Sequence, residues 1–129
     1  MFDAANDYLQ SIQARLSIST IVISITNLRL QAQGDMGLYR LRLKLIDNSL
    51  LECFELFEFQ GETKDTLKYS FHWQTNTGQL ISRWDNAPHH GEIDTFPNHV
   101  HEEQEDNVKS HHTVDMFWIL QELETKLAR

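Results

Sequence analysis

The first residues of the chain place apolar side chains at the spacing of an amphipathic helix. Apolar residues recur every three or four positions from Ala5 to Leu16, which is the period of one helix face. Asp3 stands just before this stretch as a candidate N-cap, and Arg15 near its end complements the helix dipole. The pattern predicts a helix over residues 1–17.

After this helix the spacing of apolar positions changes to two, which is the period of a strand with one buried face. In Tyr39–Leu45 a tyrosine and three leucines alternate with two arginines and a lysine, and Tyr69, Phe71 and Trp73 alternate with polar residues in the same way. The clusters of Gly, Asn, Asp and Thr between such stretches have the composition of turns. We therefore expect an antiparallel meander sheet of about five strands within residues 18–84. The expected strands are 18–30, 39–45, 50–59, 68–74 and 80–84.

The segment 85–109 has no apolar period and contains both prolines of the chain. It is longer than the ~12–15 residues above which structureless connections are usually functional or disordered, so we expect a His-rich acidic loop there. A last helix is predicted over 113–128, with an apolar stripe that starts at Met116 and with Thr113 as its N-cap. Together these elements predict a single α+β domain, 1–129, with the N-terminal and C-terminal helices packed on one face of the sheet.

The length and composition of the chain exclude several classes of protein and of metal site. A chain of 129 residues has the length of one domain. Its single cysteine, Cys53, excludes a disulfide framework and a zinc site built from cysteines within one chain. No apolar run approaches the ~18–20 residues of a membrane span, and the opening residues lack the basic stretch of a signal peptide. We therefore expect a cytoplasmic protein that does not enter membranes.

The net charge of −8 is concentrated in one segment. Residues 84–108 contain seven acids and no lysine or arginine, and six of the seven histidines lie between residues 89 and 112. Nearby negative charge favours the protonated imidazole, so we expect raised pKa values for the histidines from His89 to His101. The rest of the chain is nearly neutral, and its surface does not exclude a nucleic-acid ligand.

Residues suited to catalysis gather where the fifth expected strand meets this loop. A strand places residues two apart on one face, which groups Arg83 with Asp85 and His99 with His101. Histidine titrates near neutral pH and suits proton transfer, while a guanidinium presents fixed donors to phosphate oxygens. The candidate catalytic residues are Arg83, Asp85, His89, His90, His99 and His101.

A first interpretation of these residues is cleavage of a phosphodiester without a metal or another cofactor. Two of the histidines would transfer protons, Asp85 would orient one imidazole, and Arg83 would neutralise charge that develops on the phosphate. A basic row would hold the rest of the nucleic acid, and it consists of Arg40, Arg42, Lys44 and His72. The competing interpretation of this row is a solvated strand face that pairs with Glu52 and Glu55 across the hairpin.

Two further interpretations remain open. The first is a divalent-metal site made by His99 and His101, with Asp85 and one of His89 or His90 as further ligands, since a His-x-His pair on an extended segment can bind one ion. The second is a non-catalytic interaction protein whose negative loop attracts a basic partner.

Several segments also carry a family resemblance. They are Tyr39–Leu43, Tyr69–Gln74, Gly78–Ile81, Arg83–His90, Thr95–His101 and Ser110. Over residues 36–125 they resemble the TumE-like family of small prokaryotic toxins from type II toxin–antitoxin modules. The chain departs from the family pattern at Val100, where a basic residue is common, and in its acidic run Glu102–Asp106.

The resemblance implies a toxin that is neutralised by direct contact with an antitoxin, usually a helix-turn-helix protein encoded beside it. By analogy with other toxins of this size, it implies ribonuclease action on messenger RNA. The leading prediction is therefore a metal-independent ribonuclease toxin with an RNA substrate and an antitoxin partner. A second copy of the chain is a further candidate partner.

Overall fold

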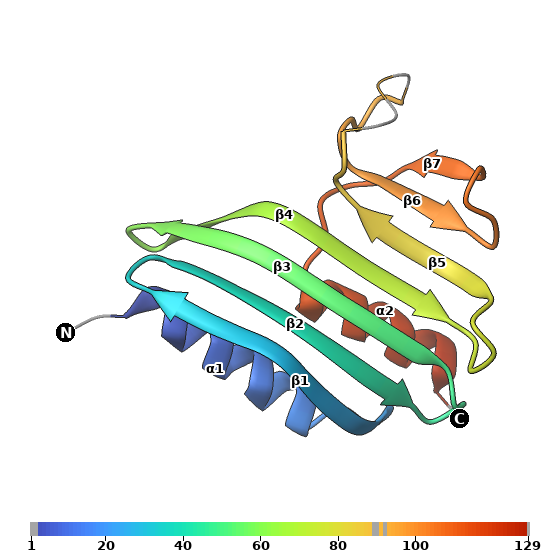
Figure 1. Ribbon diagram of the computed structural model, residues 1–129, viewed down its shortest axis with the longest axis horizontal. Coiled ribbons are helices and arrows are strands. Elements are labelled where there is room, and N and C mark those ends of the chain that lie inside the picture. The colour runs from blue at the N-terminus through green and yellow to red at the C-terminus, as the bar shows by residue number, and fades with distance from the viewer. Residues whose placement is uncertain (1–2, 89–90, 92, 129) are drawn as a thin grey trace.

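The computed structural model describes residues 3–88, 91 and 93–128, which form a sheet and two helices (Figure 1). The elements in chain order are α1 (Ala4–Ser17), β1 (Val22–Gln33), β2 (Met36–Leu45), β3 (Leu50–Gln60), β4 (Thr63–Gln74), β5 (Leu80–Asp85), β6 (His99–Glu102), β7 (Val108–Ser110) and α2 (Met116–Leu127). Every strand pairs antiparallel with the next, in the order β1-β2-β3-β4-β5-β6-β7. Both helices lie behind the sheet in Figure 1, and the predicted α+β class is confirmed.

The sheet has seven strands in the described part of the chain, where the sequence predicted about five. Of the two additional strands, β6 lies inside the segment 85–109 that was expected to be a loop, and β7 begins in it and ends one residue beyond, at Ser110. β6 is only four residues long, and both of its faces are buried. Val100 is buried on one side, and His99 and His101 are buried on the other, so the strand lacks the usual alternation of apolar and exposed polar residues. Alternation of apolar and polar residues identifies a strand only when one face meets water.

Both helices begin with an aspartate cap. The Asp3 carboxylate accepts a hydrogen bond from the Asn6 amide at 3.1 Å, as predicted. α2 is capped by Asp115, whose carboxylate accepts from the Trp118 amide at 3.0 Å. The predicted cap, Thr113, lies two residues before it in extended chain. The carboxylate at Asp115 also suits the positive end of the helix dipole.

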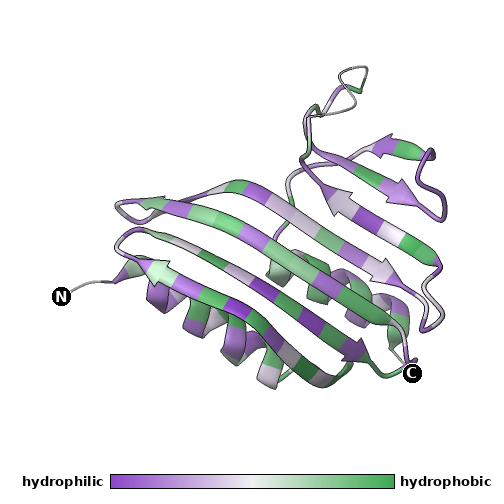
Figure 2. Cartoon of the chain, viewed as in Figure 1, coloured by the Kyte–Doolittle hydropathy of each residue, from purple (hydrophilic) through white to green (hydrophobic). Residues whose placement is uncertain are grey.

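The core lies between the sheet and the helices. Tyr39, Leu41, Leu43 and Leu45 of β2 are fully buried, while the side chains between them face away from the helices. This alternation is visible along the strands in Figure 2. In the residues that the structure describes, neither helix has the length and apolar character needed to cross a bilayer.

The core also contains a buried carboxylate, Glu55 of β3, which is 0% exposed. Its oxygens accept from the hydroxyls of Tyr8 at 2.8 Å and Tyr39 at 2.9 Å, and from Thr66 at 2.6 Å. The Lys64 ammonium lies 2.6 Å from the same carboxylate. Burial, followed by the negative charge of Glu55, raises the pKa of Tyr8 and of Tyr39, so both hydroxyls stay protonated and donate.

The two rims of the sheet differ in length and in character. β1 has 12 residues, and Ile23, Ile25 and Leu28 on it are exposed. β7 has three residues and includes Lys109. A short, charged strand protects a sheet rim from pairing with other chains, whereas a long apolar one does not.

Glu124 joins the two helices. Its carboxylate accepts from two nitrogens of the Arg15 guanidinium, one of them at 3.0 Å, and from the Ser19 hydroxyl at 2.7 Å. The hydrogen bonds from Arg15 hold the pKa of Glu124 below its ordinary value of 4.5. The ionised form therefore stabilises the fold above pH 4.5, and this contribution is lost as the pH falls through the lowered pKa.

Replacing Glu124 by glutamine is expected to lower the free energy of unfolding at pH 7 by about 1 kcal/mol, since hydrogen bonds to a charged group are lost. At pH 3 the difference from the wild type should shrink, because the wild-type carboxylate takes up a proton as the pH falls through its lowered pKa. Urea unfolding at the two pH values measures both effects. Glu122→Gln, which affects an exposed i,i+4 pair with Lys126, serves as the control with a smaller change. Equal losses for Glu124→Gln at both pH values would contradict the assignment.

Candidate functional site

Four of the predicted catalytic residues meet on neighbouring strands. Arg83 is the register partner of His101, and Asp85 is the partner of His99. Partners on adjacent antiparallel strands point to the same side of the sheet. The residues between them, Trp84 and Val100, are buried on the opposite side in the core, so the alternation of β5 and β6 directs all four polar side chains away from the helices.

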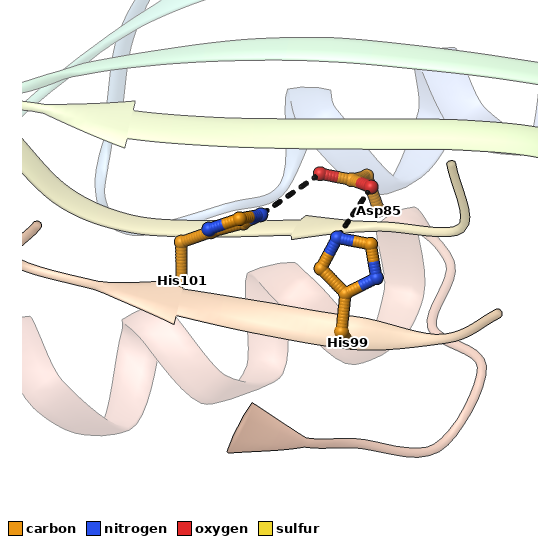
Figure 3. A group of neighbouring side chains, drawn as sticks. All are labelled: Asp85, His99 and His101. Atoms are coloured by element: carbon orange, nitrogen blue, oxygen red, sulfur yellow. Dashed lines mark ion pairs between the residues drawn. The ribbon is translucent and has the colours of Figure 1, made fainter. Parts of the chain in front are cut away.

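The side chain of Asp85 faces both imidazoles (Figure 3). Its Oδ1 lies 2.9 Å from Nε2 of His99, and its Oδ2 lies 3.7 Å from Nε2 of His101. Asp85 is only 6% exposed, His99 1% and His101 3%. A buried carboxylate requires positive or hydrogen-bonding partners, and these imidazoles supply part of that requirement.

Backbone carbonyls orient the two imidazoles. Nδ1 of His99 lies 2.8 Å from the carbonyl oxygen of Pro97, and Nδ1 of His101 lies 2.7 Å from the carbonyl oxygen of Glu105. A carbonyl oxygen only accepts, so each Nδ1 carries a proton and donates it. In both rings the atom turned towards Asp85 is therefore Nε2, which interacts favourably with the carboxylate when it carries a proton and can act as a base or bind an ion when it does not.

Arg83 completes the group. Its Nε donates to Oδ2 of Asp85 at 3.1 Å, and its Nη2 lies 3.1 Å from Nε2 of His101. The ends of the guanidinium bind both carboxylate oxygens of Glu105, with Nη1 at 2.9 Å from Oε1 and Nη2 at 2.7 Å from Oε2. The Arg83 side chain is 27% exposed and that of Glu105 is 59% exposed. These two residues form the solvent side of the cluster.

The strand connection around the cluster is fixed by further hydrogen bonds. The Ala87 amide donates to Oδ1 of Asp85 at 3.0 Å. The hydroxyl of Tyr69 donates to the side-chain oxygen of Asn98 at 2.9 Å, and burial raises the pKa of Tyr69, which keeps this hydroxyl a donor. Asp85 is thus tied to the turn that follows β5, and the residue before His99 is tied to β4.

The expected rise in histidine pKa is wrong for His101. Burial, the largest effect, lowers the pKa of His101 below its ordinary value of 6.5, and the positive charge of Arg83 lowers it further. The hydrogen bond to the Glu105 carbonyl and the charge of Asp85 act in the opposite direction without reversing the shift. Counting nearby acids in the sequence did not predict this, because burial disfavours the charged ring.

The predicted basic row lies on the same side of the sheet as the cluster. Arg42, Glu52, His72, Arg83 and His101 are successive register partners from β2 to β6. Arg40, Phe54, Ser70, Asp85 and His99 form the neighbouring row. Three strand spacings separate β2 from β5, which amounts to about 14 Å. A hollow of about 180 Å³ opens over this face, with Arg40, Arg42 and His72 in its lining.

The competing interpretation of the basic row is correct for one pair. Arg42 forms an ion pair with Glu52 at 3.0 Å, and Arg40 lies over the ring of Phe54 at 4.5 Å. Glu55 is not part of this surface, because it is three residues from Glu52 and therefore on the opposite, buried face. Lys44 lies on the same strand face as the two arginines and is exposed.

Two further points concern His89 and His90, which were predicted to be catalytic, and Glu105. His89 and His90 lie outside the described residues, so their place relative to the cluster stays a prediction. Glu105 belongs to the acidic run Glu102–Asp106, for which no contact was predicted, and it binds Arg83. Its spacing of four residues from His101 is the only sequence signal for this contact, and the turn that brings it back cannot be derived from periodicity.

The comparisons with known proteins point to one family. The family model described as Toxin TumE matches residues 11–127. No curated protein and no solved structure matches the chain. The family match covers the second half of α1, all of α2 and every described strand of the sheet, including the segment that carries Arg83, Asp85, His99 and His101. The chain therefore belongs to the TumE toxin family.

Proposed function

We propose that this toxin cleaves RNA and that the cluster of Arg83, Asp85, His99 and His101 is its catalytic centre. Membership of a toxin family implies, in general, an antitoxin partner. For this partner we propose a helix-turn-helix protein that contacts the toxin directly.

The observation that carries the proposal is the contact between Arg83 and Glu105. The guanidinium binds the two carboxylate oxygens with two nitrogens, at 2.9 and 2.7 Å, which is the forked geometry by which arginine also binds phosphate. Glu105 is the most exposed member of this contact. A phosphate of RNA that displaced Glu105 would lie beside His101 and Asp85, with its charge matched by Arg83.

The basic row offers a path for the rest of the RNA. Arg40, Arg42 and His72 share a sheet face with Arg83. His72 lies on the neighbouring strand β4, while Arg40 and Arg42 lie on β2, about 14 Å from β5. Phosphate contacts position a nucleic acid without reading its sequence. The row therefore supports binding of the RNA backbone and implies little base specificity.

The metal-free mechanism predicted from the sequence assigns proton transfer to two histidines. His101 suits the general base: its lowered pKa keeps the ring neutral at pH 7, and its Nε2 lies next to the nitrogen of Arg83 that would hold the phosphate. His99 suits a positioning role, since its two nitrogens face Asp85 and the carbonyl of Pro97. The proton donor would then come from His89 or His90.

The test is RNA cleavage by the purified chain and by Arg83→Ala. Removal of one preorganised charge donor costs about 10²–10³-fold in rate, and we expect a loss of this size. Lys126→Ala, which removes a positive charge from α2 on the other side of the sheet, is expected to cleave like the wild type. RNA that stays intact with the wild-type chain, with chelator and with added divalent ions, would refute the proposed function.

A further inference from the structure

We propose that Asp85, His99 and His101 bind one first-row divalent metal ion, with Zn²⁺ as the best chemical match. The inference rests on the proposed function in so far as it places the ion at the ribonuclease centre. In that case the ion, and not His101, would activate the attacking group, because Nε2 of His101 would be bound to the ion.

The first argument is the donor set and its spacing. Two imidazole nitrogens and a carboxylate are the ligands of several catalytic zinc sites, which keep a fourth position for water or substrate. Ligands at about 2.0–2.1 Å from a tetrahedral ion are about 3.3 Å from one another. The contacts of Asp85 with Nε2 of His99 and of His101, at 2.9 and 3.7 Å, bracket this value. All three donor atoms lie within 4.8 Å of one another.

The second argument is the orientation of both rings. Histidines that bind a metal almost always donate their other ring N–H to a carbonyl or a carboxylate. Here Nδ1 of His99 donates to the backbone carbonyl of Pro97, and Nδ1 of His101 donates to the backbone carbonyl of Glu105. The same atom, Nε2, is thereby presented by both rings to the same carboxylate (Figure 3). A pair of solvated histidines would have no reason to share this arrangement.

The third argument is rigidity. The ligands sit on paired positions of β5 and β6 rather than on a loop, and the carboxylate is held by the Ala87 amide. Ligands fixed by strands and by hydrogen bonds in this way lose little conformational freedom when an ion binds.

Arg83 is the competitor of the ion. Its guanidinium donates to Oδ2 of Asp85 and contacts Nε2 of His101, so it supplies positive charge to two of the proposed ligands. An ion that takes these two donors leaves Arg83 with Glu105, or with a phosphate that replaces Glu105. Removing the guanidinium should therefore strengthen ion binding, whereas it should weaken RNA cleavage.

The experiment uses the full chain, first treated with chelator and then titrated with Zn²⁺ by calorimetry and with Co²⁺ by visible absorption. We expect one ion per chain and the intense bands of tetrahedral Co²⁺. His99→Gln and His101→Gln should each lower the affinity by more than about 100-fold, beyond the 10–100-fold cost of changes around the ligands. The double variant His111→Ala/His112→Ala, which removes a half-buried and an exposed histidine before α2, should bind like the wild type. Circular dichroism checks that each variant is folded.

The outcomes separate this inference from the proposed function. Tighter Zn²⁺ binding by Arg83→Ala, together with slower RNA cleavage, supports both. One ion per chain without any RNA cleavage supports the metal site and refutes the ribonuclease. Absence of stoichiometric binding to the wild-type chain refutes the metal site, whatever happens to RNA. Binding that survives both glutamine variants but is lost in His89→Ala/His90→Ala refutes it as well.

Discussion

Replacing Lys64 by methionine is expected to lower the free energy of unfolding by about 3–5 kcal/mol, the cost of leaving a buried charge without its partner. Lys64 lies 2.6 Å from the fully buried carboxylate of Glu55. Methionine preserves most of the length of the side chain and removes the charge. The hydroxyls of Tyr8, Tyr39 and Thr66 would still donate to Glu55, but they carry no positive charge. Chemical denaturation at pH 7 measures the loss.

Two variants make this result specific. Lys68→Met makes the same change at an exposed position of the same strand, where surface substitutions usually alter stability by less than about 0.5 kcal/mol. The double variant Glu55→Gln/Lys64→Met removes both charges and should recover part of the stability, because a neutral amide is less costly to bury than an unpaired carboxylate. A loss for Lys64→Met no larger than that for Lys68→Met would show that the ion pair contributes little.

Asp85→Ala is expected to reduce RNA cleavage by at least about 10²-fold, within the range that a single proton-transfer arrangement contributes. The carboxylate contacts both imidazoles and Arg83, so its loss disturbs all of the proposed catalytic groups at once. The same substitution removes a ligand of the proposed metal ion. The expectation therefore holds for the metal-free and the metal-dependent mechanism.

The control for Asp85→Ala is Asp94→Ala, which removes an exposed acid from the same negative segment. It should cleave RNA at least as fast as the wild type, because less negative charge repels the substrate less. Growth arrest on expression of the chain in bacteria gives a second measurement. Cleavage by Asp85→Ala at the wild-type rate, in protein that remains folded, would exclude this cluster as the catalytic centre.

The sequence could predict most of the sheet because its long strands have one wet face. The alternation in Tyr39–Leu45 directly reflects burial against the helices. β6 could not be predicted in this way, since the histidines that alternate with Val100 are buried too. A period of two disappears from the sequence when both faces of a strand exclude water.

The candidate site was predictable in its composition and only partly in its contacts. The period of a strand correctly grouped Arg83 with Asp85 and His99 with His101, but the pairing of β5 with β6 comes from tertiary structure. Glu105 and the lowered pKa of His101 were missed for a related reason. Both depend on which groups are enclosed together, and the linear order of charges does not contain that information.

The unequal rims of the sheet limit how copies of this protein could associate. β1 on one molecule could pair with β1 of another, because the strand is long and Arg29 is its single charged residue. Each molecule has one such rim, since the opposite side ends in the three-residue β7. Pairing of β1 with β1 occupies this rim in both molecules, so assembly would stop at a dimer and would not continue into a fibre.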